Sequence, residues 1–241
     1  MLKTRGKKFG RWGGFFFILL VAQACVNFRT LSPEERQARL DRGEILNYLK
    51  PIPNTRLTIG EAQAIIDAPP QRLWNAITDY NRQSEIAPRT RSVKITKIEN
   101  NTAWVDLVLN APWPLHDAAF TLKVDHDKKE LKTHWNLVEG NIKESYGSWD
   151  IDPVPGNPNI SLVTYTLLYD DGRALPRWIV GSFSKKAVKE YIEVMREHVN
   201  DAVYDRPIYA ISILDSGSAV PKVENATSSP EFDDETKRIL R

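Results

Sequence analysis

One pair of neighbouring side chains in this 241-residue sequence has the residue types for acid–base chemistry. His116 and Asp117 stand beside each other at the end of a proline-rich stretch, residues 112–115. An imidazole titrates near neutral pH, and an adjacent carboxylate shifts its pKa, so such a pair is able to exchange protons with a substrate. The alternative for both residues is a structural role in the loop.

The other three histidines offer less to catalysis. His126 lies beside a predicted hairpin turn, His134 is expected to face solvent, and His198 lies near the end of a predicted helix. Asp106, on the same side of its strand as Trp104, is a candidate for a buried carboxylate without an evident partner. The sequence has no spacing typical of metal ligands, no nucleophile elbow and no phosphate-binding loop. It therefore predicts no metal and no cofactor, and it favours a binding protein that is not an enzyme.

The first 24 residues have the features of a signal peptide. Five basic residues precede a short apolar run at residues 15–22, and Ala22 and Ala24 flank Gln23 as at a cleavage site. The apolar run is too short to cross a bilayer, which takes about 20 apolar residues. We therefore expect residues 1–24 to be removed and the protein to be exported.

Cys25, the only cysteine, would begin the mature chain. Residues 20–25 resemble a bacterial lipobox, with Ala22 in the place where leucine is usual. The resemblance implies that Cys25 carries a lipid, and two or three acyl chains hold a protein on a membrane stably. An aspartate after the lipidated cysteine would signal retention at the inner membrane. The valine at this position, Val26, weakly favours location at the outer membrane. The alternative is ordinary cleavage after Ala24, which leaves a free thiol.

The charge balance changes once the leader is set aside. The whole chain has a formal net charge of +2, but the leader holds 5 of the 33 basic residues and none of the 31 acidic ones. The remaining part therefore carries a formal net charge of −3. This balance argues against a nucleic-acid surface, which needs clustered basic residues on the folded domain.

Apolar periodicity predicts a sheet followed by one long helix. Residues 176–200 have apolar side chains at three- and four-residue spacing and polar ones between them, as in an amphipathic helix. Two short helices, at residues 71–78 and 83–87, follow the first strand. Seven strands are expected, at residues 57–67, 92–99, 102–110, 118–127, 130–139, 142–152 and 160–169. Their inner surface is larger than one helix can cover, so a cavity or cleft is expected between them.

The sequence divides into four parts. After the signal peptide, residues 25–53 are expected to hold a polar helix from Ser32 to about residue 46, with serine as N-cap and proline at its first position. Residues 54–202 form the predicted folded domain. Residues 203–241 are rich in Ser, Pro, Asp and Glu, so we expect this extension to be largely disordered.

Five motifs within residues 57–200 resemble the START-related helix-grip (SRPBCC) superfamily, in particular its polyketide cyclase and coenzyme Q-binding START-like branch. They are the Ala-Pro entry to a helix with Trp74 (66–74), Thr78-Asp79-Tyr80 followed by Pro88, the proline-aromatic-proline loop (111–117), Gly147-Ser148-Trp149, and the link at 169–176, where Asp171 replaces the family's proline. The resemblance implies an α+β helix-grip fold, in which a seven-stranded antiparallel curved sheet wraps around the long C-terminal helix and two short helices follow the first strand.

The resemblance also implies a hydrophobic pocket between sheet and helix that holds a lipid, sterol, quinone or polyketide. Residues predicted to bind the ligand, most of them from the alternation along the strands, are Trp104, Trp113, Phe120, Leu122, Trp135, Trp149, Tyr165, Ile179, Phe183 and Tyr191. Trp113 and Trp178 are expected at the mouth, where indole rings favour a membrane interface. The alternative is that these large side chains fill the core and leave no space for a ligand.

These observations favour a membrane-tethered domain that binds and transfers a hydrophobic small molecule or lipid in the bacterial cell envelope, facing the periplasm. One alternative is a structural lipoprotein with a filled cavity that binds a protein partner. Another is a cyclase or hydratase that uses His116 and Asp117 as its acid–base pair.

Overall fold

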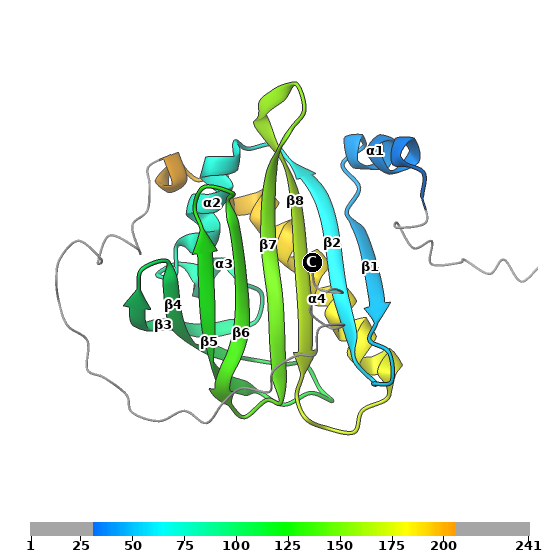
Figure 1. Cartoon of the computed structure of the whole chain (residues 1–241), viewed down its shortest axis with the longest axis vertical. Helices are drawn as coiled ribbons and strands as arrows, with labels where there is room; N and C mark the ends of the chain where they lie inside the picture. The colour runs from blue at the N-terminus through cyan, green and yellow to red at the C-terminus, as the bar shows by residue number, and fades with distance from the viewer. Residues whose placement is uncertain (1–30, 206–241) are drawn as a thin grey trace, which may run out of the picture.

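The computed structural model describes residues 31–205, which fold as one curved antiparallel sheet with helices packed against it (Figure 1). In chain order the elements are α1 (Pro33–Asp41), β1 (Leu46–Pro51), β2 (Thr58–Ile66), α2 (Pro70–Thr78), α3 (Gln83–Ile86), β3 (Thr90–Glu99), β4 (Thr102–Leu109), β5 (Ala118–Asp127), β6 (Lys132–Gly140), β7 (Glu144–Val154), β8 (Asn157–Asp170), α4 (Arg177–His198) and the short 3-10 helix η2 (Ala202–Asp205). The signal peptide, Cys25 and nearly all of the C-terminal extension lie outside the described residues.

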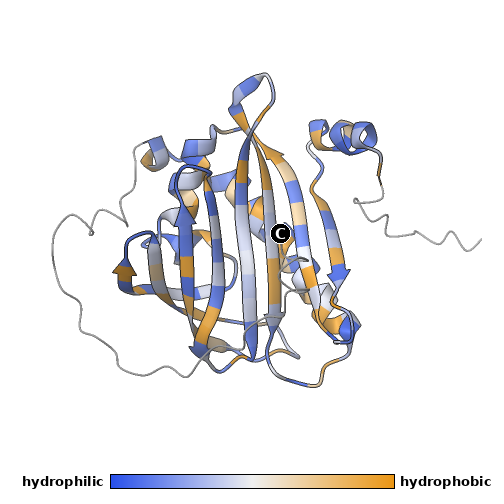
Figure 2. Cartoon of the chain, in the orientation of Figure 1, coloured by the Kyte–Doolittle hydropathy of each residue, from blue (hydrophilic) through white to orange (hydrophobic). Residues whose placement is uncertain are grey.

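The strand order β1-β2-β8-β7-β6-β5-β4-β3 confirms the helix-grip fold. Every other pair of neighbouring strands in the sheet is also consecutive in the chain. The exception is the pair β2 and β8, which joins the first two strands to the last one. All pairs are antiparallel, and inward-facing residues alternate with outward-facing ones, as the banded colouring along several strands shows (Figure 2).

The sheet has eight strands, so the predicted number of seven is corrected. The polar helix α1 begins as expected, with Ser32 accepting a hydrogen bond from the backbone N–H of Glu35 at 3.1 Å, but it ends at Asp41. The following residues form β1 along the edge of β2. Leu46 packs with Leu40 in a small apolar cluster that joins α1 to the outer face of the sheet. Pairing and burial here outweigh the local preference for helix.

The long helix α4 covers only one side of the inner face. It packs chiefly on β2, with further contacts to β8 and β1, and Figure 1 shows it passing behind these strands. Gly60 on β2 permits the close approach, because a Cβ atom there would lie 3.0 Å from the carbonyl oxygen of Ser184. The inner face of β3 to β6 therefore has no long helix against it.

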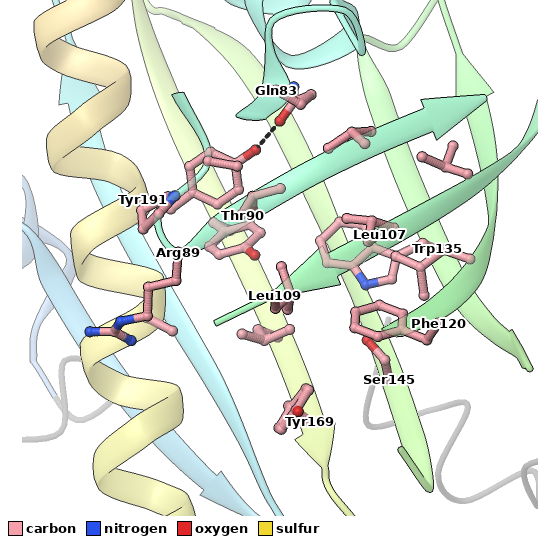
Figure 3. A pocket seen from close by; sticks show the side chains of 18 of the residues that line it. Gln83, Arg89, Thr90, Leu107, Leu109, Phe120, Trp135, Ser145, Tyr169 and Tyr191 are labelled. Carbon is pink, nitrogen blue, oxygen red and sulfur yellow. Dashed lines mark hydrogen bonds between the residues drawn. The ribbon is translucent and has the colours of Figure 1, made fainter. Parts of the chain in front are cut away.

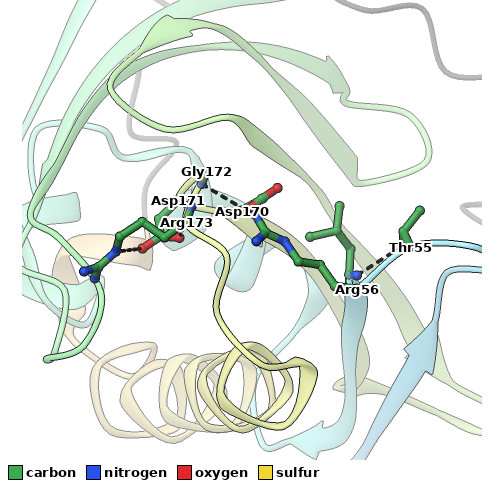
Figure 4. Close-up of polar contacts among 7 residues, drawn as sticks. Thr55, Arg56, Asp170, Asp171, Gly172 and Arg173 are labelled. Carbon is green, nitrogen blue, oxygen red and sulfur yellow. Dashed lines mark hydrogen bonds and ion pairs between the residues drawn. The ribbon is translucent and has the colours of Figure 1, made fainter.

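The link from β8 to α4 fixes the position of the helix (Figure 4). The carboxylate of Asp170 is buried and accepts hydrogen bonds from Arg56 at 3.1 Å and from the backbone N–H of Gly172 at 2.9 Å. Asp171 accepts bonds from the side chain and backbone N–H groups of Arg173. Two carboxylates thus order this link.

No helix among residues 31–205 is long and apolar enough to span a membrane.

Candidate ligand-binding site

A cavity of about 170 Å³ lies between α4 and the uncovered part of the sheet (Figure 3). Its walls are mostly aliphatic and aromatic. The inner face of the strands contributes Val93, Val105, Leu107, Leu109, Phe120, Leu122, Val124, Trp135, Trp149, Tyr165 and Leu167, and α4 contributes Phe183, Ala187 and Tyr191. The cavity exists because the sheet is wider than the single helix laid across it, as the strand pattern predicts.

An aromatic cluster forms the wall below α4. The rings of Trp149 and Tyr165 stack with centroids 4.2 Å apart, and Trp135 lies 5.8 Å from Tyr165. Tyr191 on α4 places its edge against both Trp149 and Tyr165. Its hydroxyl donates to Gln83 on α3, so the helix and the short α3 are tied together at this end of the cavity (Figure 3).

An ion pair stands at the rim. The guanidinium of Arg89 lies 2.8 Å from the carboxylate of Glu190, and both side chains line the cavity while remaining about a quarter exposed. Arg89 also lies over the ring of Phe183, 5.9 Å from its centroid. Its backbone has φ of 62°, a left-handed conformation that costs a non-glycine residue about 1 kcal/mol. The pair joins the sheet side of the cavity to α4.

A buried tyrosine–histidine pair lies at another wall. The hydroxyl of Tyr80 is 2.8 Å from Nε2 of His126, and Nδ1 of His126 is 3.0 Å from the carbonyl oxygen of Asn101. Because a carbonyl only accepts, Nδ1 carries the proton and Nε2 accepts from Tyr80. Burial raises the pKa of Tyr80 and lowers the pKa of His126, so both are neutral at pH 7. Tyr80 lines the cavity, whereas His126 lies behind it.

Seven of the residues predicted from the sequence to bind a ligand come together in the cavity wall: Phe120, Leu122, Trp135, Trp149, Tyr165, Phe183 and Tyr191. They share the face that the alternation along the strands and the spacing along the helix predict.

Trp104, Trp113 and Ile179 do not line the cavity, and their placement is corrected. On β4 the cavity takes Val105, Leu107 and Leu109, so Trp104 points to the outer face, where the ammonium of Lys97 lies 4.3 Å from its ring centroid. The alternation along the strands placed Trp104 inside, but a shift of one residue in a strand exchanges the two faces. Trp113 is 91% exposed in its loop. Ile179 lies in the first turn of α4, before the helix reaches the cavity.

The acid–base pair proposed from the sequence lies outside the cavity. His116 and Asp117 are both exposed, and the carboxylate of Asp117 lies 3.4 Å from Arg91. Asp106 is also on the outer face, where it accepts a hydrogen bond from Thr121 at 2.7 Å. His116 and Asp117 were paired because they are neighbours in the sequence, and this does not reveal whether they lie inside or outside the cavity.

The sequence reasoning missed the polar residues of the cavity: Tyr80, Gln83, Arg89, Thr90, Asn110, Thr133, Ser145, Tyr169 and Glu190. For Tyr169 a signal existed, because it continues the alternation of Tyr165 and Leu167 on β8. Arg89 and Glu190 are 101 residues apart in the sequence, and only the fold brings them together.

Comparison with solved structures shows the same fold in several proteins. A STAR-related lipid transfer protein from Xanthomonas axonopodis matches with a TM-score of 0.55 and 16% identity over 65% of this chain and 94% of that one. A protein from Thermus thermophilus matches with a TM-score of 0.52 and 19% identity over 58% and 94%. The Zhui aromatase/cyclase from Streptomyces sp. R1128 matches with a TM-score of 0.50 and 16% identity over 64% and 98%. No curated protein matches the sequence.

The comparisons contradict the prediction that the protein is not an enzyme. The model of a family described as "Polyketide cyclase / dehydrase and lipid transport" matches residues 66–196, and that description includes enzymes as well as lipid carriers. The Streptomyces protein of the same fold is an aromatase/cyclase. The match covers more than half of the chain and every residue that lines the cavity. The chain therefore belongs to the polyketide cyclase / dehydrase and lipid transport family.

Proposed function

We propose that this protein binds a hydrophobic ligand in the cavity under α4 and exchanges it with a membrane in the bacterial cell envelope. The observation that carries the proposal is the cavity of about 170 Å³ with its wall of aromatic and aliphatic side chains. The described large side chains do not fill this space, which argues against the structural lipoprotein with a closed core. Ligand binding agrees with the family to which the chain belongs.

The size of the cavity limits what it encloses. An apolar cavity of roughly 150 Å³ holds a benzene molecule. The cavity of about 170 Å³ therefore takes a ring system or a short alkyl segment, and a longer chain extends through the rim at Arg89 and Glu190. Each methylene moved from water into such a site contributes about 0.8 kcal/mol, but a methylene moved from a bilayer contributes almost nothing. The site thus favours exchange with a membrane over irreversible extraction.

Native mass spectrometry with lipid extraction tests this function. We expect the protein purified from a bacterial host to carry a near-stoichiometric apolar species. Removal of the aromatic wall from water lowers the free energy of the system and so favours a bound ligand. An apo mass alone, with no uptake from liposomes, would contradict ligand binding and favour a structural role.

Two exposed tryptophans support contact with a membrane. Trp113 and Trp178 are 91% and 72% exposed. Trp113 lies two residues after Ala111, and Trp178 lies about one and a half helical turns before Phe183. Ala111 and Phe183 both line the cavity. Indole rings favour the membrane–water interface. The lipid expected on Cys25, outside the described residues, would hold these side chains near the bilayer.

The double variant Trp113→Ala/Trp178→Ala is expected to lower the rate of ligand transfer between liposomes at least about fivefold, which corresponds to about 1 kcal/mol of lost apolar burial. Its unfolding midpoint should stay close to that of the parent, because both side chains are exposed. Trp104→Ala, which removes an indole from the outer face of the sheet, serves as the control. Equal transfer by all three proteins would remove the tryptophans from the membrane contact.

A second candidate function, cyclisation or dehydration of a polyketide-like substrate, is favoured by the Tyr80–His126 pair beside the cavity. The Tyr80 oxygen accepts a proton from a substrate carbon next to a carbonyl as its own proton passes to the lone pair of Nε2 of His126, and the electron pair of the broken C–H bond forms an enolate. When the enolate expels a β-hydroxyl group, the proton on Nε2 returns through Tyr80 to that oxygen, which leaves as water. Burial raises the pKa of Tyr80 and lowers the pKa of His126, so both groups are neutral before the reaction begins.

Tyr80→Phe tests this enzyme function with a short poly-β-ketone as substrate. The variant is expected to lower turnover about 100-fold or more, the usual contribution of one acid–base group, and to leave binding of the substrate unchanged. Mass spectrometry would detect the product that has lost water. Turnover that survives in Tyr80→Phe would remove the pair from the chemistry, and no turnover by the parent protein would leave ligand binding as the function.

A further inference from the structure

The hydroxyl of Tyr169 is buried in the cavity wall without a hydrogen-bond partner. Its side chain is 4% exposed and lies on the inner face of β8, one residue before the end of that strand. In the described part of the chain seven buried side-chain atoms lack a partner, in Thr58, Gln63, Asp79, Tyr169, Arg173, Ser184 and Tyr204. Only Tyr169 among these seven residues lines the cavity. The other unpartnered atoms belong to contacts elsewhere in the fold and offer nothing to a ligand in this space.

A second residue with a hydroxyl lies opposite Tyr169 in the sheet. Ser145 on β7 is directly opposite Tyr169 in the β7–β8 register, is 3% exposed and also lines the cavity. Directly opposed residues of an antiparallel pair carry their side chains on the same face, with Cβ atoms roughly 5 Å apart. Figure 3 shows both residues in the part of the cavity away from Gln83, which is already bonded to Tyr191.

Apolar side chains of the cavity wall lie beside Tyr169, while the charged groups of Asp170, Asp171 and Arg173 in the following link are also near its hydroxyl. The ring of Phe183 lies 5.3 Å from that of Tyr169, and Phe120 and Leu109 belong to the same wall. Burial raises the pKa of Tyr169, so its phenol keeps the proton and remains both a donor and an acceptor. A polar group in such surroundings is costly unless it is paired. A ligand oxygen that pairs with it therefore gains binding free energy that a hydrocarbon of the same shape does not.

We propose that the ligand of this cavity is an apolar ring or chain that carries an oxygen function, a hydroxyl or carbonyl, and that the Tyr169 hydroxyl hydrogen-bonds this oxygen. The aromatic cluster binds the apolar part of the ligand, and the hydrogen bond to Tyr169 determines the orientation of the ligand in the cavity. The inference rests on the proposed binding function and specifies the class of ligand. A site built to bond an oxygen discriminates against the analogue that lacks it.

Naphthalene and 2-naphthol are the probes that test this inference, because they share a ring system and differ by one hydroxyl. Affinities of both are measured by equilibrium dialysis on the full-length protein and on Tyr169→Phe. The ratio of the two affinities cancels the difference in their hydration when it is compared between proteins, as in a double-mutant cycle. We expect the preference for 2-naphthol to fall roughly twofold to tenfold in Tyr169→Phe, the range of one net hydrogen bond.

Tyr204→Phe is the matched control. Tyr204 is fully buried, its hydroxyl is also unpartnered, and it does not line the cavity. We expect this variant to keep the parental preference. Retained naphthalene binding by Tyr169→Phe shows that the variant is folded and that its cavity is intact.

The outcomes separate the two proposals. If both probes bind the parent protein but the preference is the same in Tyr169→Phe, or falls equally in Tyr204→Phe, the oxygen-directed inference is overturned and hydrophobic binding stands. If neither probe binds the parent protein, the proposed binding function fails, and the inference fails with it.

Discussion

Gly147→Ala is expected to destabilise the protein by about 3 kcal/mol. A Cβ atom on Gly147 would overlap the indole of Trp135 and the carbonyl oxygen of Thr166 on β8. The second overlap is with backbone, so a new side-chain rotamer cannot relieve it. The glycine of the Gly147-Ser148-Trp149 motif is therefore explained by the ring that crosses it.

The consequence extends to the cavity, because Trp135 is part of its wall. Relief of the overlap moves the indole, and the ring of Tyr165 beside it loses its neighbour. Urea unfolding measures the loss of stability. Gly156→Ala adds the same methyl group in a turn where no atom lies within 4 Å, and only its φ of 80° opposes the change, which costs about 1 kcal/mol. A loss in Gly147→Ala no larger than this control would refute the packing argument.

Ala187→Trp is expected to reduce ligand binding at least about tenfold, equal to about 1.4 kcal/mol or more. Ala187 lines the cavity from α4 between Phe183 and Tyr191, one helical turn from each. An indole at this position occupies the space that the ligand needs. Since the surrounding wall is apolar, the new side chain finds apolar contacts, and the unfolding free energy should not decrease by more than about 1 kcal/mol.

Lys189→Trp is the matched control, because Lys189 is on the exposed side of the same helix. Native mass spectrometry of the three proteins from one host compares the fraction that carries a ligand. We expect a bound species in the parent protein and in Lys189→Trp and an apo mass in Ala187→Trp. Ligand retained by Ala187→Trp in the parental amount would place the binding site elsewhere.

The description of the family names both cyclases or dehydrases and lipid transport, and the two functions make different demands on a cavity. A lipid carrier needs an apolar wall and a route to the membrane. An enzyme needs in addition a group that moves a proton at the bound substrate. This chain has the wall, and it has Tyr80 with His126 behind it. The variants Tyr80→Phe and Tyr169→Phe therefore separate chemistry from recognition at two different places in one cavity.

Sequence periodicity determined the elements of this fold because their signals are local. Seven of the eight strands, both short helices and the long helix follow from alternation of apolar residues, prolines and turn residues in the chain. The strand β1 escaped because its stability comes from the edge of β2 and from Leu40 on α1, which are tertiary contacts. The helix α1 was predicted too long for the same reason.

Large apolar residues on the inner parity of the strands, such as Phe120 and Trp149, were placed in the cavity wall by the sequence alone. Trp104 was misplaced because alternation along a strand does not reveal which of its two faces is covered, and only the neighbouring Val105 and Leu107 in the folded sheet show it. Its indole found a cation on the outer face instead of the core.

The polar residues of the cavity were decided by the tertiary structure. Arg89 contacts Glu190 only because α4 crosses the inner face of the sheet. Tyr80 contacts His126 only because the sheet curves. Pairing across such distances in sequence leaves no periodic signal, because each residue is spaced to suit its own element. Composition and period determined the fold and its surplus of apolar residues. The crossing of one helix over a wider sheet decided where space remains and left the buried hydroxyl of Tyr169, a residue of the cavity wall, without a partner.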